Sequence, residues 1–236
     1  LGFGVIEPFA QAYPDQFANA GIAEQNMTGM AAGLAQSGYK VFTYSIANFT
    51  TLRCFEQIRN DVCYHDANVN VVSIGGGYAY GALSFTHHAT EDLAVMRALP
   101  NMTVVAPADP QEAMQATLAL INDPHPSYLR RNRAGDAPVH DSDITFELGK
   151  AIEVMAGSDV TLIGTGAIMT TVVEAAQQLN VQGVSTRVLS MHTIKPIDVE
   201  ALVRAANETS LLVTVEEHSL VGGLGSAVLE ALTDAG

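Results

Sequence analysis

The residue with the clearest chemical potential is a carboxylate at the start of a helical stretch, residues 21–35 (Gly-Ile-Ala-Glu-Gln-Asn-Met-Thr-Gly-Met-Ala-Ala-Gly-Leu-Ala). Glu24 falls in the first turn of the predicted helix, and apolar residues follow it at roughly helical spacing. Burying a charge without a partner is costly, so an acid on a buried helix needs a reason. Glu24 either complements the helix dipole or serves in a reaction. Small residues between positions 29 and 33 thin one side of the helix, so we expect another backbone to approach it closely.

Two further segments place candidate groups where a predicted strand ends, which is where open α/β sheets bind ligands. Phe49 stands at the first such point and either offers an aromatic face to a flat ring or belongs to the core. The glycine-rich segment 75–92 follows the next strand and contains His87 and His88. These histidines suit proton transfer or hydrogen bonding to a substrate, or they are solvated loop residues. Adjacent histidines make a poor chelate and no cysteine or third histidine completes a site, so we predict no metal ligand.

Basic groups gather at the end of the predicted strand within Pro126–Arg133, which holds three of the chain's 11 lysines and arginines. Guanidinium groups at a strand end suit phosphate or carboxylate binding, or they form surface ion pairs with the aspartates that follow. Two segments in the second half of the chain carry weaker signals. Gly164-Thr-Gly166 lacks the third glycine of a nucleotide-binding fingerprint. The segment 216–225 (Glu-Glu-His-Ser-Leu-Val-Gly-Gly-Leu-Gly) is expected to be a turn and helix start, or an interface.

Composition excludes several classes of protein. With 48% hydrophobic and 15% charged residues among 236, the chain can bury a sizeable core and is not disordered. A net charge of −14 argues against nucleic acid as a partner. The two cysteines form no metal-ligand pattern and indicate a reduced, cytoplasmic protein, and the sequence contains no membrane span or signal peptide. The chain starts at Leu1 and stops inside or just after a helix-like segment, so we expect both ends to be trimmed.

Strand-like apolar runs alternate with helical patterns along the chain. Several runs are continuously apolar, as in parallel sheets that are covered on both faces. The alternation predicts the α/β class, with two domains that each hold a mostly parallel sheet flanked by helices. The polar segment 135–146 is predicted to link domains at 1–134 and 147–236. The predicted strands are Lys40–Tyr44, Val69–Ile74, Met102–Ala106, Ser127–Leu129, Val160–Ile163, Thr186–Ser190 and Leu211–Val215, and the predicted helices are Ala23–Ser37, Phe49–Cys63, Thr90–Ala98, Pro110–Asn122, Met169–Leu179, Asp198–Ala206 and Gly223–Leu232.

Taken together, these segments resemble the thiamine-diphosphate enzymes of the transketolase type, over nearly the whole chain. The resemblance rests on residues 21–27, Phe49–Arg59 (Phe-Thr-Thr-Leu-Arg-Cys-Phe-Glu-Gln-Ile-Arg), Thr86–Asp92 (Thr-His-His-Ala-Thr-Glu-Asp), Leu99–Asp109 and the strand that ends in Arg133. It implies a pyrimidine-binding domain followed by the smaller transketolase C-terminal domain, to which we assign a role in assembly.

The resemblance also implies a set of cofactor-binding residues. Glu24 matches the catalytic glutamate that hydrogen-bonds the aminopyrimidine ring of thiamine diphosphate and so promotes formation of its ylide. Phe49 matches the aromatic residue that stacks on the pyrimidine. Ile46 and Arg53 are expected to complete this part of the site.

A second set of residues is implied to bind the substrate. His87 matches a catalytic histidine that hydrogen-bonds the donor sugar, His88 is expected to help bind the sugar, and Arg133 matches the arginine that holds its phosphate. Larger transketolases carry another histidine just after the strand and an acidic residue before the Thr-His pair. Here those regions read Gly75-Gly-Gly and Leu83, so the sugar preference of the family does not transfer.

The Gly-Asp-Gly stretch that binds the diphosphate and its metal in this family is absent from the sequence. In the family, the pyrimidine domain of one unit meets the diphosphate domain of another, so half of the cofactor site is missing. We therefore expect a separate N-terminal transketolase subunit that holds Mg²⁺ or Ca²⁺, and an α2β2 assembly around a two-fold axis. Apolar surface near Glu24 is expected to await that partner.

The resemblance thus predicts the C-terminal subunit of a split transketolase, which transfers a two-carbon ketol unit from a ketose phosphate to an aldose acceptor. Three alternatives are a 1-deoxyxylulose-5-phosphate synthase-like enzyme, the beta subunit of a 2-oxo-acid dehydrogenase, and an inactive structural or regulatory half. The paired histidines and Arg133 favour a sugar-phosphate enzyme over the dehydrogenase. The presence of Glu24, Phe49, His87 and Arg133 argues against the inactive half.

Overall fold

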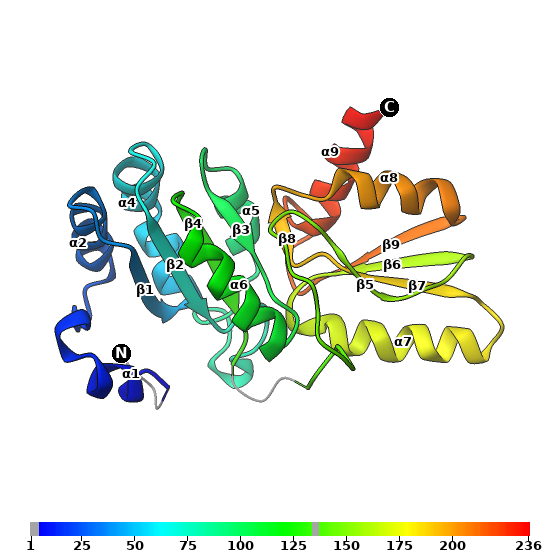
Figure 1. Ribbon diagram of the computed structural model, residues 1–236, viewed down its shortest axis with the longest axis horizontal. Helices are drawn as coiled ribbons and strands as arrows, with labels where there is room; N and C mark the ends of the chain where they lie inside the picture. Colours follow the sequence, from blue (N-terminus) through cyan, green and yellow to red (C-terminus); the bar gives the residue numbers. More distant parts are fainter. Residues whose placement is uncertain (1–4, 134–136) are drawn as a thin grey trace.

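Buried, mostly aliphatic strands build two separate sheets in this protein, whose computed structural model describes residues 5–133 and 137–236. The two α/β units lie side by side, the N-terminal unit on the left of Figure 1 and the C-terminal unit on the right. In both units most neighbouring strands are parallel and helices flank the sheet. The predicted class, α/β with two mostly parallel sheets, is therefore confirmed. Among the described residues, no helix is both long and apolar enough to cross a bilayer.

The first sheet runs in the order β1-β2-β4-β3-β8. Its first four members are parallel, while β8 is antiparallel to β3 and comes from the second half of the chain. β8 was not predicted from the sequence because Ile194 is its one apolar residue, whereas the equally short β3 lies within the predicted apolar run Met102–Ala106. The strands are β1 (Val41–Ile46), β2 (Val69–Ile74), β3 (Thr103–Val105), β4 (Ser127–Arg131) and β8 (Thr193–Lys195).

The helix predicted over residues 49–63 is broken into four short helical segments. The hydroxyl groups of Thr50 and Thr51 both donate to the carbonyl of Ala47, and Thr51 leaves helical geometry with ψ of −81°. Such back-bonding competes with the regular ladder, so the helix cannot continue through this point. The helical segments of the first unit are α1 (Glu7–Ala12), η1 (Pro14–Gln16), α2 (Glu24–Gln36), α3 (Ala47–Thr50), η2 (Leu52–Cys54), α4 (Phe55–Gln57), η3 (Ile58–Cys63, π-helical), η4 (Gly81–Leu83), α5 (Asp92–Arg97) and α6 (Pro110–Asn122).

The second sheet has the order β5-β7-β6-β9, with β5 antiparallel at one edge. Sequence analysis missed β5, a half-buried edge strand, but it predicted β7 and β9 with the bounds that the structure has. The elements are β5 (Ile152–Met155), β6 (Val160–Gly164), η5 (Gly166–Ile168), α7 (Met169–Val181), β7 (Thr186–Ser190), α8 (Val199–Glu208), β9 (Leu211–Val215) and α9 (Leu224–Ala235).

The segment that follows the first unit packs against both units. The buried Glu112 side chain accepts hydrogen bonds from His140 Nε2 (2.8 Å), Ser190 Oγ (2.6 Å) and the backbone nitrogen of Ala108 (2.7 Å). Burial lowers the pKa of His140, but the hydrogen bond to Glu112 and its charge more than offset this, so the pKa is raised. Residues 134 and 135, where the predicted domain boundary falls, lie outside the described residues, and the boundaries stay a prediction.

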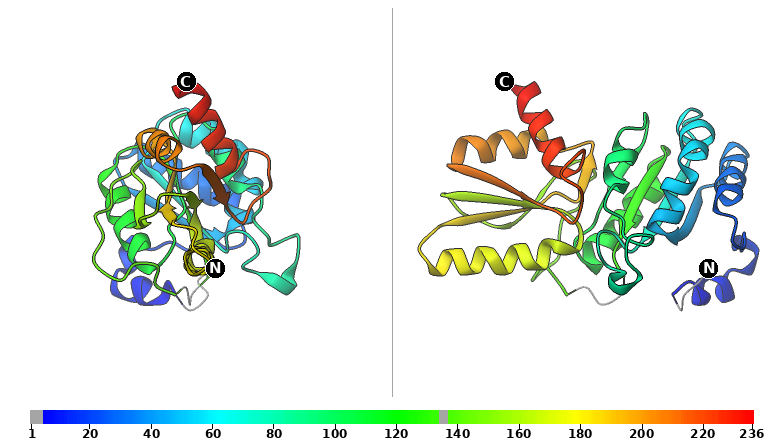
Figure 2. Two further views of the ribbon diagram at one scale, coloured as in Figure 1. Left: turned by 90° about the vertical axis from the view of Figure 1, so that its right-hand side faces the viewer. Right: turned by 180° about the vertical axis from the view of Figure 1, so that it is seen from behind.

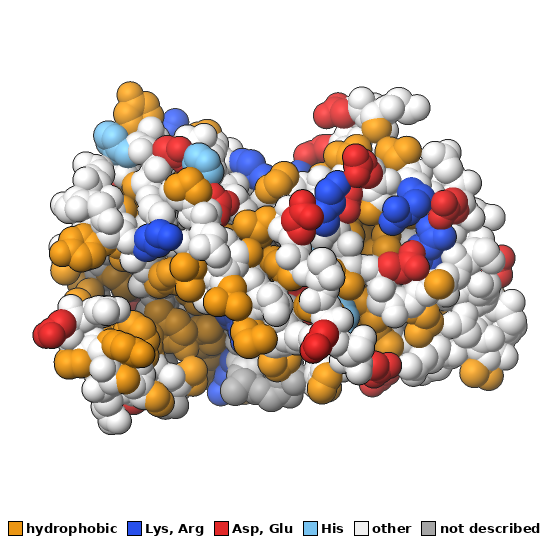
Figure 3. Space-filling view, viewed as in Figure 1, with side chains coloured by type: hydrophobic (Ala, Val, Ile, Leu, Met, Phe, Trp, Pro, Cys, Tyr) orange, Lys and Arg blue, Asp and Glu red, His pale blue; other side chains and the backbone are white. Residues whose placement is uncertain are grey.

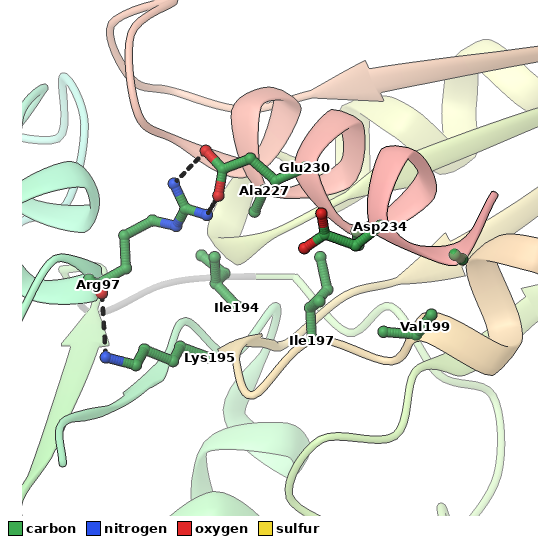
Figure 4. Close-up of a pocket in the computed structure, with 10 residues that line it drawn as sticks. Arg97, Ile194, Lys195, Ile197, Val199, Ala227, Glu230 and Asp234 are labelled. Carbon is green, nitrogen blue, oxygen red and sulfur yellow. Dashed lines mark hydrogen bonds and ion pairs between the residues drawn. The ribbon is translucent and has the colours of Figure 1, made fainter. Parts of the chain in front are cut away.

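Where α5, β8 and α9 meet, the two units form a groove of about 460 Å³ (Figure 4). Arg97 reaches across it to Glu230, with Nη2 2.5 Å from Oε2, and Lys195 Nζ donates to the backbone carbonyl of Arg97. Ile194 and Ile197 supply apolar walls. None of the predicted site residues lines this groove, so it belongs to the contact between the units.

Candidate active site

Three neighbouring parallel strands, β1, β2 and β4, end at one edge of the first sheet. The segment after β1 forms α3 and carries Phe49, the long loop after β2 carries His87, and the residues after β4 include Arg133. Only residues 37–40 connect α2 to β1, so the helix runs back along the strand and its first turn, with Glu24, lies at the same edge. Ligands bind at this edge in open α/β sheets.

Glu24 begins α2 and is buried, with 3% of its surface exposed. Its Oε2 accepts a hydrogen bond from Arg53 Nη1 at 2.9 Å. Its Oε1 is also buried and has no hydrogen-bond partner among the residues that the structure describes. A buried acceptor left without a partner costs about 1–3 kcal/mol, so this oxygen marks a place where a donor is missing.

Phe49 and Arg53 stand together beside Glu24. The Arg53 guanidinium carbon lies 4.2 Å from the centre of the Phe49 ring, so the cation covers one face of that ring. The His87 ring meets Phe49 edge-on, with ring centres 5.3 Å apart. Ile46, the last residue of β1, is buried beneath α3 and its carbonyl accepts a hydrogen bond from Thr50. The structure thus brings Glu24, Arg53 and Phe49 together, and Ile46 directly precedes α3, which carries Phe49.

Tyr80 connects His87 to Arg133, and sequence analysis did not identify it. Its ring meets His87 edge-on at 5.6 Å, and the Arg133 guanidinium carbon lies 5.1 Å from the centre of the same ring. Burial raises the pKa of the Tyr80 phenol by more than the Arg133 charge lowers it, so this pKa lies above its ordinary value. A side chain at Gly75 would collide with the Tyr80 ring, which therefore fills the space beside that glycine. The only signal in the sequence is an aromatic residue within a glycine-rich loop.

His88 has different surroundings from those of its neighbour. Its Nε2 lies 3.0 Å from the carbonyl of Gly81, and its ring meets Tyr78 edge-on at 5.2 Å. The described contacts of His88 thus hold the loop against itself, whereas His87 contacts Phe49 and Tyr80. Of the two predicted substrate histidines, the structure brings only His87 into contact with the predicted cofactor residues.

Two of the three arginines at the end of β4, Arg130 and Arg133, differ in burial and in their contacts. Arg130 is buried and pairs with the buried Asp92, with Nε 2.8 Å from Oδ2. Tyr128 donates a hydrogen bond to the same carboxylate oxygen at 2.5 Å. Arg130 is therefore a structural residue, while the exposed Arg133 has its side chain at the site. Ion pairs with the following aspartates, the alternative expected from the sequence, are not the role of Arg130.

Apolar side chains near Glu24 are exposed. Along α2 the buried positions are Glu24, Thr28, Ala31 and Ala32, whereas the larger apolar residues Met30 and Leu34 are exposed. Side chains added at Gly29 and Gly33 would meet no atom of the described residues within 4 Å. In Figure 3, hydrophobic side chains surround a hollow at the lower left of the first unit. The exposed apolar residues of α2, of the two residues before it and of η2 are Ile22 (88%), Met30 (45%), Leu34 (43%) and Leu52 (44%).

Among the described residues, no group of three or more His, Cys, Asp or Glu side chains is arranged to hold a metal ion. The site therefore offers an acid, an aromatic ring, a histidine and two arginines, without a cation site of its own in the part that the structure describes. Such a set can bind a flat heterocycle beside the acid and an anion beside Arg133.

Comparisons with known proteins cover both units. A model of the transketolase pyrimidine-binding domain matches residues 3–135, and one of the transketolase C-terminal domain matches residues 149–236. An apulose-4-phosphate transketolase subunit from Phocaeicola vulgatus is 43% identical over 234 residues, which cover 99% of this chain and 75% of that protein. A 6-deoxy-6-sulfo-D-fructose transketolase subunit from a Clostridium species (strain MSTE9) is 37% identical over 227 residues, 96% of this chain and 70% of that protein.

A solved structure has the same fold. A split gene transketolase, solved as an inactive beta4 tetramer, matches with a TM-score of 0.89 and 43% identity, over 96% of this chain and 74% of that chain. Because the match covers 96% of this chain, the two structures are similar in both units.

Proposed function

This chain belongs to the transketolase family, and we propose that it is the C-terminal subunit of a split transketolase that is active only with a partner subunit. The proposed domains are a pyrimidine-binding domain at 1–134, a linker at 135–146 and a C-terminal domain at 147–236. The observation that carries the proposal is Glu24, a buried carboxylate with one oxygen paired to Arg53 and the other without a partner among the described residues.

The residues present fit the pyrimidine half of thiamine diphosphate. A protonated ring nitrogen next to Glu24 Oε1 would donate to that buried oxygen and give it the partner it lacks. The Phe49 ring offers an aromatic face, and Ile46 and Arg53 complete this end of the site. When bound, thiamine diphosphate supplies a nucleophilic carbon that attacks the carbonyl of a ketose.

The chain's own residues then have distinct tasks. Arg53 holds one oxygen of Glu24, and the other oxygen shares a proton with the cofactor's ring nitrogen as a general acid and base. His87 donates a hydrogen bond to the carbonyl or a hydroxyl group of the sugar, and its contact with Phe49 sets its place relative to the cofactor. His88 supports the same loop from the side of Tyr78.

We propose that the donor is a ketose with an anionic group, from which a two-carbon ketol unit passes to an aldose acceptor. The bond between C2 and C3 of the ketose breaks, the C3 hydroxyl loses its proton, and an aldose two carbons shorter leaves. A new bond then forms to the aldehyde carbon of the acceptor, whose oxygen gains a proton and becomes the C3 hydroxyl of the new ketose. The two similar subunits described above act on sugars whose names include a phosphate or a sulfonate group. Arg133, exposed and held beside Tyr80, is the group that meets this anion.

The partner in this proposal is an N-terminal transketolase subunit that holds the diphosphate and Mg²⁺ or Ca²⁺. The exposed apolar residues near Glu24 form the surface that it covers, and two copies of each subunit assemble as α2β2. The related structure is an inactive beta4 tetramer, which supports a requirement for the second subunit. Two free, buried cysteines support a cytoplasmic location.

The test is transfer of a labelled carbon pair by the complex of this chain with its N-terminal subunit. A ketose phosphate labelled with ¹³C at C1 and C2 is incubated with an aldose acceptor and followed by NMR. Label in the first two carbons of a new ketose is the expected result. A product made from pyruvate would instead indicate one of the alternative enzymes, and a complex that binds cofactor without transfer would indicate an inactive half.

A further inference from the structure

We propose that residues Glu217–Ser219 of the second unit, here called the brace, position the loop that carries Tyr80 and His87. The inference rests on the proposed function, because it takes His87 to face the substrate. It gives the C-terminal domain a role in the active site in addition to assembly. Figure 2 shows the turn before α9, which includes the brace, at the boundary between the two units.

A backbone bridge between two residues closes the base of the loop. Gly77 and Ala89 form an isolated antiparallel bridge, in which each backbone nitrogen donates to the other's carbonyl at 2.9 Å. Residues 78–88 extend from this bridge and include Tyr80 and His87. The bridge therefore fixes the base of the loop, and its position affects that of His87, which is also held by contacts with Phe49 and Tyr80 and by the bond from Asn48 Nδ2 to the carbonyl of Thr86 (3.3 Å).

The brace contacts both sides of the bridge. On one side, Glu217 packs so closely that a Cβ added at Gly77 would lie 2.5 Å from the Glu217 Cβ. On the other side, the backbone nitrogen of Ser219 donates to the carbonyl of Thr90 at 2.7 Å. The second unit thus supports each of the two chain segments that hold the loop.

A buried cation joins the brace to the bridge. Arg130 Nη2 donates to the carbonyl of Ala89 at 2.7 Å and to the carbonyl of Glu217 at 2.9 Å. The ion pair with Asp92 fixes this guanidinium, and both side chains are nearly inaccessible to solvent. Removing one partner of such a pair leaves an uncompensated buried charge, so the arrangement resists displacement.

The middle residue of the brace contacts α5. His218 Nε2 accepts a hydrogen bond from the backbone nitrogen of Ala94 at 3.3 Å, while Nδ1 lies 2.8 Å from the carbonyl of Ser219. These two contacts require the tautomer with its proton on Nδ1. The brace is therefore fixed to the helix that follows the loop as well as to the bridge.

Two glycines provide a matched pair of variants. Gly77 and Gly81 both have positive φ, +59° and +45°, so alanine causes similar backbone strain at each. Only at Gly77 does the new Cβ collide with the brace; at Gly81 it meets nothing among the described residues within 4 Å.

A small displacement of a substrate-positioning group can lower a rate on the order of 100-fold. In the complex with the N-terminal subunit, we expect Gly77→Ala to lower kcat/KM for the ketose phosphate roughly 10- to 100-fold and Gly81→Ala less than about 3-fold.

Other readouts separate positioning from general damage. Affinity for thiamine diphosphate should stay within about 2-fold of wild type in Gly77→Ala, because Glu24 and Phe49 lie on other segments. The double variant Gly77→Ala/Glu217→Gly removes the colliding Cβ and should recover most of the lost activity. Hydrogen exchange at the amide of Ala89, measured in the same complex, should be faster in Gly77→Ala than in Gly81→Ala and slow again in the double variant.

Equal activity losses in the two alanine variants, no loss in Gly77→Ala, or no recovery in the double variant would overturn the inference. If the wild-type complex transfers no ketol unit, the proposed function fails. Hydrogen exchange still decides the inference in that case, because protection of Ala89 that does not depend on the brace contradicts it.

Discussion

Replacing Glu24 by Gln distinguishes a carboxylate kept for a ligand from one kept for the fold. The chain offers a matched control, because Glu24 and Glu112 are both buried, with 3% and 0% of their surfaces exposed. Both oxygens of Glu112 accept hydrogen bonds from described residues, whereas Glu24 has only the bond from Arg53. The same substitution should therefore have opposite consequences at the two positions.

The magnitudes follow from these partners. Glu112→Gln loses a charge-assisted bond to the buried His140, so the free energy of unfolding should fall by about 1.5–3 kcal/mol. The Glu24 pair contributes less than about 1 kcal/mol, because Arg53 is 44% exposed and solvent screens it. Glu24→Gln also removes the negative charge from a buried carboxylate whose Oε1 has no partner among the described residues. The free energy of unfolding of this variant should therefore stay within about 1 kcal/mol of wild type. In the complex, the lost charge-assisted bond to the cofactor should weaken thiamine diphosphate roughly 10- to 150-fold, equivalent to about 1.5–3 kcal/mol.

Two assays measure these effects. Denaturant unfolding of the chain gives stability, and calorimetric titration of the complex gives cofactor affinity, while exchange of the cofactor's C2 proton for deuterium reports whether it is activated. Glu24→Gln should lose affinity and most of the exchange without losing stability. The reasoning is refuted if Glu24→Gln is destabilised as much as Glu112→Gln, or if it binds and activates the cofactor like wild type.

Three further predictions concern other residues. Arg133→Ala should weaken phosphorylated donors by about 1.5–3 kcal/mol in kcat/KM, and an equal loss for unphosphorylated analogues would make this arginine structural. Tyr80→Leu should raise the KM for the donor more than Tyr78→Leu does, because only the Tyr80 ring lies between His87 and Arg133; equal effects would rule out that role. The pKa of His140 is raised in the fold because Glu112 more than offsets the effect of burial, so this pair stabilises fully below about pH 6.5 and loses its contribution as pH rises through the raised value. Unfolding free energies of wild type and His140→Gln should therefore converge at alkaline pH, and a constant difference would contradict the assignment.

The sequence predicts most of the sheets because their strands are long, apolar and bounded by turns. The bounds of β2, β7, β9 and α6 agree with the prediction. Asp109 caps α6, with its Oδ1 2.9 Å from the Glu112 nitrogen. Short or interrupted elements are not predictable in this way. β8 has one apolar residue among its three, and the helix predicted at 49–63 breaks where threonine hydroxyls bond to the backbone.

At the site, sequence reasoning finds residues whose type limits their use and misses those defined by distant contacts. Glu24 could be selected because an acid on a buried helix is uncommon, and the structure does bury it. Tyr80 has no such signal, since its place depends on His87 and Arg133 from other segments. Arg130 could not be separated from its neighbours either, because Asp92, its partner, lies 38 residues away.

Whether the cofactor site is shared between two subunits can be measured by calorimetric titration of thiamine diphosphate with Mg²⁺. The titration is made into this chain alone and into its complex with the N-terminal transketolase subunit, and Glu24→Gln is run in both. We expect thiamine diphosphate to bind only to the complex, and to bind it more weakly when Glu24 is replaced by Gln. Tight binding by the chain alone would contradict a site shared between two subunits.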